Sequence, residues 1–243
     1  MSDPEDRHEF SHGEGFDDPY DGFDIDPPEF VVGPDSVDPA DSHVLADILD
    51  KRQIAADQVD TDALLDVGLE YMGINRYEEA IRTFERVVSY ADEESLLAQE
   101  ALVNKGAAHA ELEEWDEAIG AYESAIHIDE RSEYAAVAEM NLGYARWEYG
   151  QHDRALEHAE RAVEIDDRLP QAWYNRGYFL LERGLADDAL FCLENAERLG
   201  FRNPELQEEK ARALEELGEY EEAAEIVDEL ESMQESATED FLS

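Results

Sequence analysis

One pair of small residues recurs along most of this chain at a constant separation of twelve positions. The first member of each pair lies in one helical stretch, and the second lies in the next stretch, beyond a short break. Each pair therefore predicts a helical hairpin whose two helices cross where small side chains let their axes approach. The five pairs are Gly68 with Ala80, Gly106 with Ala118, Gly143 with Ala155, Gly177 with Ala189, and Ala211 with Ala223.

The hairpins recur at intervals of 38, 37, 34 and 34 residues, measured between their first small residues. Because the separation inside each hairpin is constant, the extra residues of the two longer intervals must lie between hairpins, at about 92–95 and 130–132. A single hairpin cannot bury its own apolar face, so neighbouring hairpins must stack. The spacing predicts an all-α array of five repeats. Their expected ranges are 61–92, 99–130, 136–167, 170–201 and 204–235.

The repeats resemble the tetratricopeptide repeat, a helix-turn-helix unit of about 34 residues. Besides the small residues, the resemblance is carried by Tyr71, Phe84, Tyr122, Leu142, Trp173, Leu214, Gly218 and Tyr220, and it covers about residues 61–235. It implies a right-handed α-solenoid in which the first helix of each repeat lines the concave side. The proline that often closes a unit of this family is replaced here by Asp92, Glu130 and Asp167.

The position just before the small residue of the first helix departs from the family pattern in three repeats. It is usually leucine in the family, but it is Lys105, Arg176 or Lys210 here. A long basic side chain can pack its stem against apolar surface while its charge reaches a nearby acid. We expect structural ion pairs at these positions, and no catalytic role.

Residues 1–41 differ in composition from the repeats, with 14 acidic side chains, one base and six of the chain's eight prolines. Such a segment buries too little apolar surface to offset its ordering entropy, so we predict a disordered acidic arm. Its aromatic residues alternate with acids, a pattern typical of short binding segments; the alternative is a tail that only aids solubility. We expect an N-terminal helix and linker at 42–60 and a frayed acidic tail at 236–243.

The chain holds 65 acidic and 18 basic residues, which gives a formal net charge of −47. This charge repels phosphates and anionic lipid headgroups, so we expect no nucleic acid and no membrane as a direct partner. Acid spread along the whole chain, with few lysines, resembles proteins of salt-loving archaea, in which salt screens the self-repulsion of the surface. The alternative is that the acid docks a basic partner.

Three features of the sequence favour a cytoplasmic location. The N-terminus has no basic stretch followed by an apolar run, so we expect no signal peptide. No apolar stretch approaches the roughly 18 residues of a membrane span. The single cysteine, Cys192, excludes an intramolecular disulfide, and its apolar helical surroundings indicate a buried, inert thiol.

An asparagine lies two residues before the small residue of the first helix in three consecutive repeats, at Asn104, Asn141 and Asn175. On a helical wheel with about 100° per residue, this position faces the concave side of the array. A side-chain amide donates and accepts hydrogen bonds at once, so the ladder is expected to hold the backbone of an extended peptide. The alternative is that these amides bridge neighbouring helices within the solenoid.

The same face carries large apolar and aromatic side chains in the third and fourth repeats. They are Met140, Tyr144, Trp147, Tyr174 and Tyr178. Such side chains on a solvent-facing wall form a binding patch, and the polar atoms of tyrosine and tryptophan can stay hydrated there. We predict that they contact a peptide; the alternative is that curvature packs them against the next helix.

The sequence contains no GxxxxGK[ST], GxGxxG, HExxH or GxSxG motif. We therefore expect no catalysis, no cofactor and no bound metal. The expected function is a non-enzymatic protein–protein interaction scaffold or adaptor that binds an extended peptide or a partner helix in a concave groove. The alternative is a regulatory protein whose acidic N-terminal arm occupies its own groove or docks a basic partner. The oligomeric state stays open.

Overall fold

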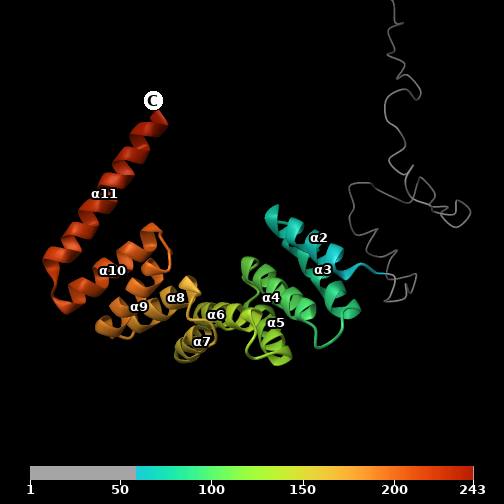
Figure 1. Cartoon of the computed structure of the whole chain (residues 1–243). Coiled ribbons are helices and arrows are strands. Elements are labelled where there is room, and N and C mark those ends of the chain that lie inside the picture. Colours follow the sequence, from blue (N-terminus) through green and yellow to red (C-terminus); the bar gives the residue numbers. More distant parts are fainter. Residues whose placement is uncertain (1–58, 243) are drawn as a thin grey trace, which may run out of the picture. The chain divides into compact units, whose positions relative to one another are not determined.

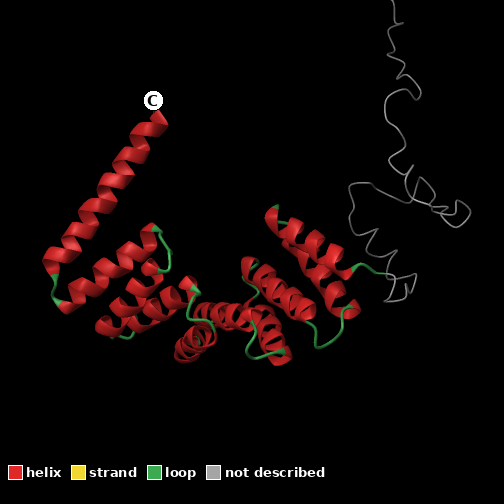
Figure 2. Cartoon of the chain, in the orientation of Figure 1, coloured by secondary structure: helices red, strands yellow, loops and turns green. Residues whose placement is uncertain are grey.

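The computed structural model describes residues 59–242, and it describes side chains for residues 59–232. Every regular element in this part of the chain is an α-helix, and short loops join the helices (Figure 2). The predicted fold class, an all-α solenoid of helix-turn-helix repeats, is confirmed. The predicted acidic arm, 1–41, and most of the predicted N-terminal helix and linker, 42–60, lie outside the described residues.

The described helices follow one another as five hairpins (Figure 1). The hairpins are α2 (Thr61–Gly73) with α3 (Tyr77–Tyr90), α4 (Leu96–Glu111) with α5 (Trp115–Ile128), α6 (Glu133–Glu148) with α7 (His152–Ile165), α8 (Pro170–Leu181) with α9 (Ala186–Arg198), and α10 (Pro204–Leu217) with α11 (Tyr220–Leu242). Each helix packs against the next one in the chain, and the first helices of successive hairpins also contact one another. The five predicted repeats correspond to these five hairpins.

The first helices of the second and third hairpins begin earlier than predicted, at Leu96 and Glu133 rather than at 99 and 136. Serine caps both helices: the Ser95 hydroxyl accepts from the Ala98 amide at 3.1 Å, and the Ser132 hydroxyl accepts from the Ala135 amide at 2.9 Å. The extra residues of the longer intervals therefore lengthen α4 and α6 to 16 residues each.

The last helix continues past residue 235, where the repeat pattern ends the fifth repeat. α11 runs to Leu242. No glycine or proline interrupts residues 219–243, so nothing in the local sequence ends the helix earlier. The segment 236–243, for which a frayed tail is predicted, therefore overlaps the end of α11.

The small residues lie where the two helices of each hairpin cross, as predicted. A methyl group added at Gly106 would lie 2.5 Å from the ring of Tyr122, and one added at Gly143 would lie 3.0 Å from the backbone oxygen of Ala155. The paired alanines of the second helices are buried in all five hairpins. The helices approach this closely because the first helix has no larger side chain at the crossing.

One residue of the turn between the two helices is left-handed in every hairpin, seven positions after the small residue of the first helix. These residues are Asn75, Glu113, Gly150, Gly184 and Gly218, and their φ angles lie between 58° and 83°. Glycine adopts this conformation freely, and asparagine tolerates it, whereas most side chains are strained there. Glu113 is therefore the strained member of the set.

Replacing Glu113 with glycine is expected to raise the free energy of unfolding by about 0.5–1 kcal/mol, because the substitution releases backbone strain. The matched change in the next hairpin, Gly150→Ala, introduces strain at the equivalent turn, and it is expected to lower the free energy of unfolding by about 1 kcal/mol. Urea denaturation followed by circular dichroism measures both values. Shifts of the same sign would contradict a shared requirement for a left-handed turn.

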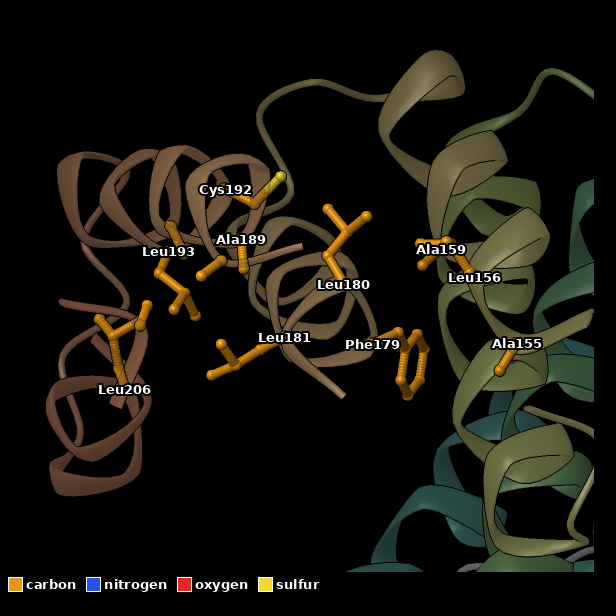
Figure 3. Close-up of a cluster of buried hydrophobic side chains, with 13 residues drawn as sticks. Ala155, Leu156, Ala159, Phe179, Leu180, Leu181, Ala189, Cys192, Leu193 and Leu206 are labelled. Atoms are coloured by element: carbon orange, nitrogen blue, oxygen red, sulfur yellow. The ribbon is translucent and has the colours of Figure 1, made fainter. Parts of the chain in front are cut away.

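The largest described cluster of buried side chains joins the third, fourth and fifth hairpins (Figure 3). Phe179 of α8 points toward Ala155 and Leu156 of α7, and Leu193 of α9 lies toward Leu206 of α10 (Figure 3). All of these side chains are buried. Since each hairpin shares its core with its neighbours, the stability of a hairpin depends on the stacking of the array.

A buried side-chain amide, which the sequence pattern does not predict, connects the second hairpin to the third. The side chain of Gln99 on α4 is fully buried. Its Nε2 donates to the backbone oxygens of Ala125, at 2.9 Å, and Asp129, at 2.8 Å. Its Oε1 accepts from the hydroxyl of Ser132 at 2.7 Å. These hydrogen bonds offset the burial of the amide and hold the residue that caps α6.

The three basic residues before the crossing positions make the expected ion pairs. Their partners are Glu85 for Lys105 at 2.7 Å, Glu160 for Arg176 at 3.6 Å, and Glu197 for Lys210 at 2.7 Å. Each acid belongs to the second helix of the preceding hairpin. These side chains therefore connect neighbouring hairpins, which confirms their structural role.

Candidate functional site

The first helices carry two columns of side chains at equivalent positions. One residue after the small residue, the column consists of Tyr144, Tyr178 and Arg212 in the last three hairpins. Five residues after it, the column consists of Glu111, Glu148, Glu182 and Glu216 in the last four hairpins. Because residues four apart lie on the same side of a helix, the two columns run side by side.

A third column lies two residues before the small residue and contains Asn104, Asn141, Asn175 and Glu209. The charged and aromatic members of the three columns interact with one another across α6, α8 and α10. We call Tyr144, Glu148, Tyr178, Glu182 and Glu209 the tyrosine–glutamate face.

Tyr144 and Tyr178 present aromatic surface on this face. Tyr144 is 47% exposed, although its ring meets the edge of Trp115 with centroids 6.2 Å apart. Tyr178 is partly buried, and its ring lies 5.4 Å from that of Trp147. Tyr144 thus leaves nearly half of its surface to solvent, while neighbouring rings hold Tyr178 in place.

Three other predicted contact residues are partly buried and take part in packing between hairpins. Trp147 stacks on Phe179 of α8, with centroids 4.9 Å apart and an interplanar angle of 23°. Met140 packs against the small cluster that contains Val163, and Tyr174 lies 5.0 Å from the ring of Phe201. Packing within the array therefore accounts for much of the surface of Met140, Trp147 and Tyr174.

The three asparagines of the predicted ladder have different surroundings, and all three are partly buried. The amide nitrogen of Asn104 donates to the backbone oxygen of Glu100 in its own helix at 2.9 Å. The amide nitrogen of Asn175 reaches the backbone oxygen of Met140 at 3.5 Å. Within the described residues, the Asn141 amide makes no hydrogen bond. The Asn141 amide thus differs from those of Asn104 and Asn175, which lie within reach of backbone oxygens.

Burial and neighbouring carboxylates raise the pKa values of the tyrosines on this side of the array. Burial, followed by the charges of Glu209 and Glu205, raises the pKa of Tyr174 to about 12. Burial and then Glu148 raise the pKa of Tyr144, and burial and then Glu182 raise that of Tyr178. These phenols stay protonated near neutral pH and remain hydrogen-bond donors.

Among the described residues, Arg212 is the basic side chain that pairs with this face. Its guanidinium lies 2.6 Å from Glu182, 3.4 Å from Glu209 and 3.7 Å from Glu216. Its charge lowers the pKa values of Tyr178 and Glu209, but in both groups burial has the larger, opposite effect. We call the junction between the first helices of two successive hairpins a step. The step between α8 and α10 thus contains an arginine among three carboxylates.

The glutamate column and Arg212 are the members of the site that are not predicted from the sequence. A signal for the column is present, since glutamate recurs five residues after the small residue in four consecutive hairpins. In a chain with 65 acidic residues, however, this recurrence does not stand out from the background. The spacing of four residues already places each glutamate near the tyrosine of its own helix. The influence of Glu148 on Tyr178 of the next hairpin becomes evident once the hairpins are stacked.

Other kinds of site have little support in the described part of the chain. No group of three or more histidine, cysteine, aspartate or glutamate side chains there is placed to hold a metal ion. Among the described helices, none combines the length and the apolar character needed to span a membrane. Cys192 is buried, and burial raises the pKa of its thiol to about 11, so the thiol is protonated at neutral pH.

Three sequence models of the tetratricopeptide repeat match the chain, over residues 61–94, 97–168 and 140–200. No curated protein sequence matches it.

Solved structures share the fold at low sequence identity. A crystal structure of MamA is 21% identical, covers 74% of this chain and 94% of its own, and has a TM-score of 0.58. PilF from Pseudomonas aeruginosa is 22% identical, with coverages of 71% and 75% and a TM-score of 0.61. YrrB, described as a TPR protein with an unusual peptide-binding site, is 19% identical, with coverages of 72% and 87% and a TM-score of 0.55. The sequence models together span more than half of the chain, which therefore belongs to the tetratricopeptide-repeat proteins.

Proposed function

We propose that this chain is a non-enzymatic protein–protein interaction scaffold that holds an extended peptide or a partner helix along its tyrosine–glutamate face. The observation that carries the proposal is the exposure of Tyr144, a large aromatic side chain that keeps 47% of its surface accessible on a first helix. Tyr178 lies at the equivalent position of the next hairpin. Asn141, whose amide bonds no other described residue, lies on the same side of α6 as Tyr144. Aromatic anchors beside free amides suit recognition of a peptide backbone.

Two further observations support a protein partner. YrrB, which shares the fold, is described as having a peptide-binding site. The net charge of −47 opposes binding to nucleic acid or to an anionic membrane.

A regulatory role of the acidic arm is the second candidate, favoured by its alternating acids and aromatics. Occupation of the chain's own face by the arm would bring 14 acids toward the glutamate column. The like charges oppose that contact, so docking of the arm to a separate basic partner is the stronger form of this candidate.

Selection of peptides from a displayed random library tests the scaffold function. Peptides recovered on the full chain are expected to bind Asn141→Ala and Tyr144→Ser at least about fivefold more weakly, because one substitution removes a backbone contact and the other an anchor. The matched control is Asn195→Ala on α9, whose amide nitrogen donates to the Phe191 backbone oxygen at 2.8 Å. Circular dichroism checks that helicity is kept.

If the selected peptides bind Asn141→Ala and Tyr144→Ser as tightly as they bind the wild-type chain, the binding surface lies elsewhere. Tighter binding after deletion of residues 1–41 would instead indicate that the arm occupies the face.

A further inference from the structure

Two neighbouring steps of the tyrosine–glutamate face carry a glutamate at equivalent positions, but only one of them also carries an arginine. Between α8 and α10, Arg212 pairs with Glu182 across the two hairpins at 2.6 Å. Between α6 and α8, the residue equivalent to Arg212 is Tyr178, and the residue equivalent to Glu182 is Glu148. Glu148 makes no ion pair within the described part of the chain. This step therefore keeps the equivalent of Glu182 but has a tyrosine in place of the arginine and an asparagine, Asn175, in place of Glu209.

The step between α6 and α8 is also bordered by aromatic surface. Glu148 lies near enough to Tyr144 and Tyr178 for its charge to raise the pKa values of both phenols. Tyr144 is 47% exposed, and Glu148 is exposed as well. A carboxylate next to two tyrosine rings offers a cation both an ion pair and aromatic faces to lie against.

We propose that the partner held on this face is an arginine-bearing segment of a protein, whose guanidinium lies beside Glu148 and against Tyr144 and Tyr178. The inference rests on the proposed function and specifies the chemistry of the partner. Charge complementarity is its main support: between α8 and α10 the protein itself pairs an arginine, Arg212, with Glu182, the residue equivalent to Glu148. Arginine suits the step better than lysine, because its planar group stacks on aromatic rings and pairs with carboxylates through two N–H groups.

Peptide selection in about 0.5 M KCl, which screens the general attraction of cations to an acidic protein, tests the proposal. A displayed random library is recovered on the full wild-type chain, on Glu148→Gln and on Glu157→Gln. Glu157 is an exposed acid on α7 of the same hairpin, so its substitution removes the same charge from a different helix. Wild type and Glu157→Gln are expected to enrich arginine over glutamine at one position about tenfold, and Glu148→Gln about twofold or less.

The outcomes separate this inference from the proposed function. An arginine preference that survives in Glu148→Gln, or that falls equally in Glu157→Gln, overturns the inference, because net charge and not this step then selects the partner. Peptides that depend on Tyr144 but show no preference for arginine also overturn it, while the scaffold function stands. Failure to recover any peptide that depends on Tyr144 overturns both. Equal helicity of the three proteins by circular dichroism excludes misfolding as the cause.

Discussion

Gly106→Ala is expected to lower the free energy of unfolding by about 2 kcal/mol. The new methyl group would lie 2.5 Å and 2.7 Å from two ring carbons of Tyr122, a ring that is 2% exposed. The ring cannot move aside freely, because it packs in a cluster with Val103, Ala125 and Leu142. The clash outweighs the gain in helix propensity of about 1 kcal/mol that alanine brings over glycine.

The matched control is Gly120→Ala on α5, in the same hairpin. A methyl group there meets nothing within 4 Å, and the position is exposed. This variant is expected to gain about 0.5–1 kcal/mol from helix propensity alone. Urea denaturation of both variants, followed by circular dichroism, measures the difference. If Gly106→Ala were as stable as Gly120→Ala, the helices of this hairpin would not be in contact at Gly106.

The second large effect concerns salt. Raising KCl from about 0.05 M to about 2 M is expected to raise the melting temperature by more than about 10 °C. The formal net charge of −47 makes the folded chain repel itself, and the described ion pairs engage few of its acids. Screening shortens the range of that repulsion from about 10 Å at 0.1 M salt to about 3 Å at 1 M salt.

Sucrose at equal osmolality is the control for this experiment, because it stabilises folded proteins by exclusion from their surface without screening charge. A melting temperature that is insensitive to KCl would contradict the hypothesis of a protein adapted to a saline cytosol. An equal rise in sucrose would assign the effect to solvent exclusion and not to screening.

The sequence pattern predicted the repeats better than it predicted the contacts of individual side chains. The sequence pattern placed Trp147 and Tyr144 on the same face, yet Trp147 stacks on Phe179 while Tyr144 is 47% exposed. The pattern likewise made Asn104 and Asn141 equivalent. Asn104 donates to a carbonyl of its own helix, whereas Asn141 has no such bond within the described residues. Equivalent positions differ because their rotamers respond to different neighbours.

The sequence by itself determined the number of hairpins, their crossing points and the helical class. Helical periodicity and turn chemistry act over a few residues, and a close crossing demands a small side chain at a definite position, so these features leave local marks. Only the tertiary structure decided which side chains meet between hairpins, such as Gln99 with Ser132 and Arg212 with Glu182. Those partners are 33 and 30 residues apart, and their contact depends on the stacking geometry and side-chain rotamers, which a local pattern does not encode.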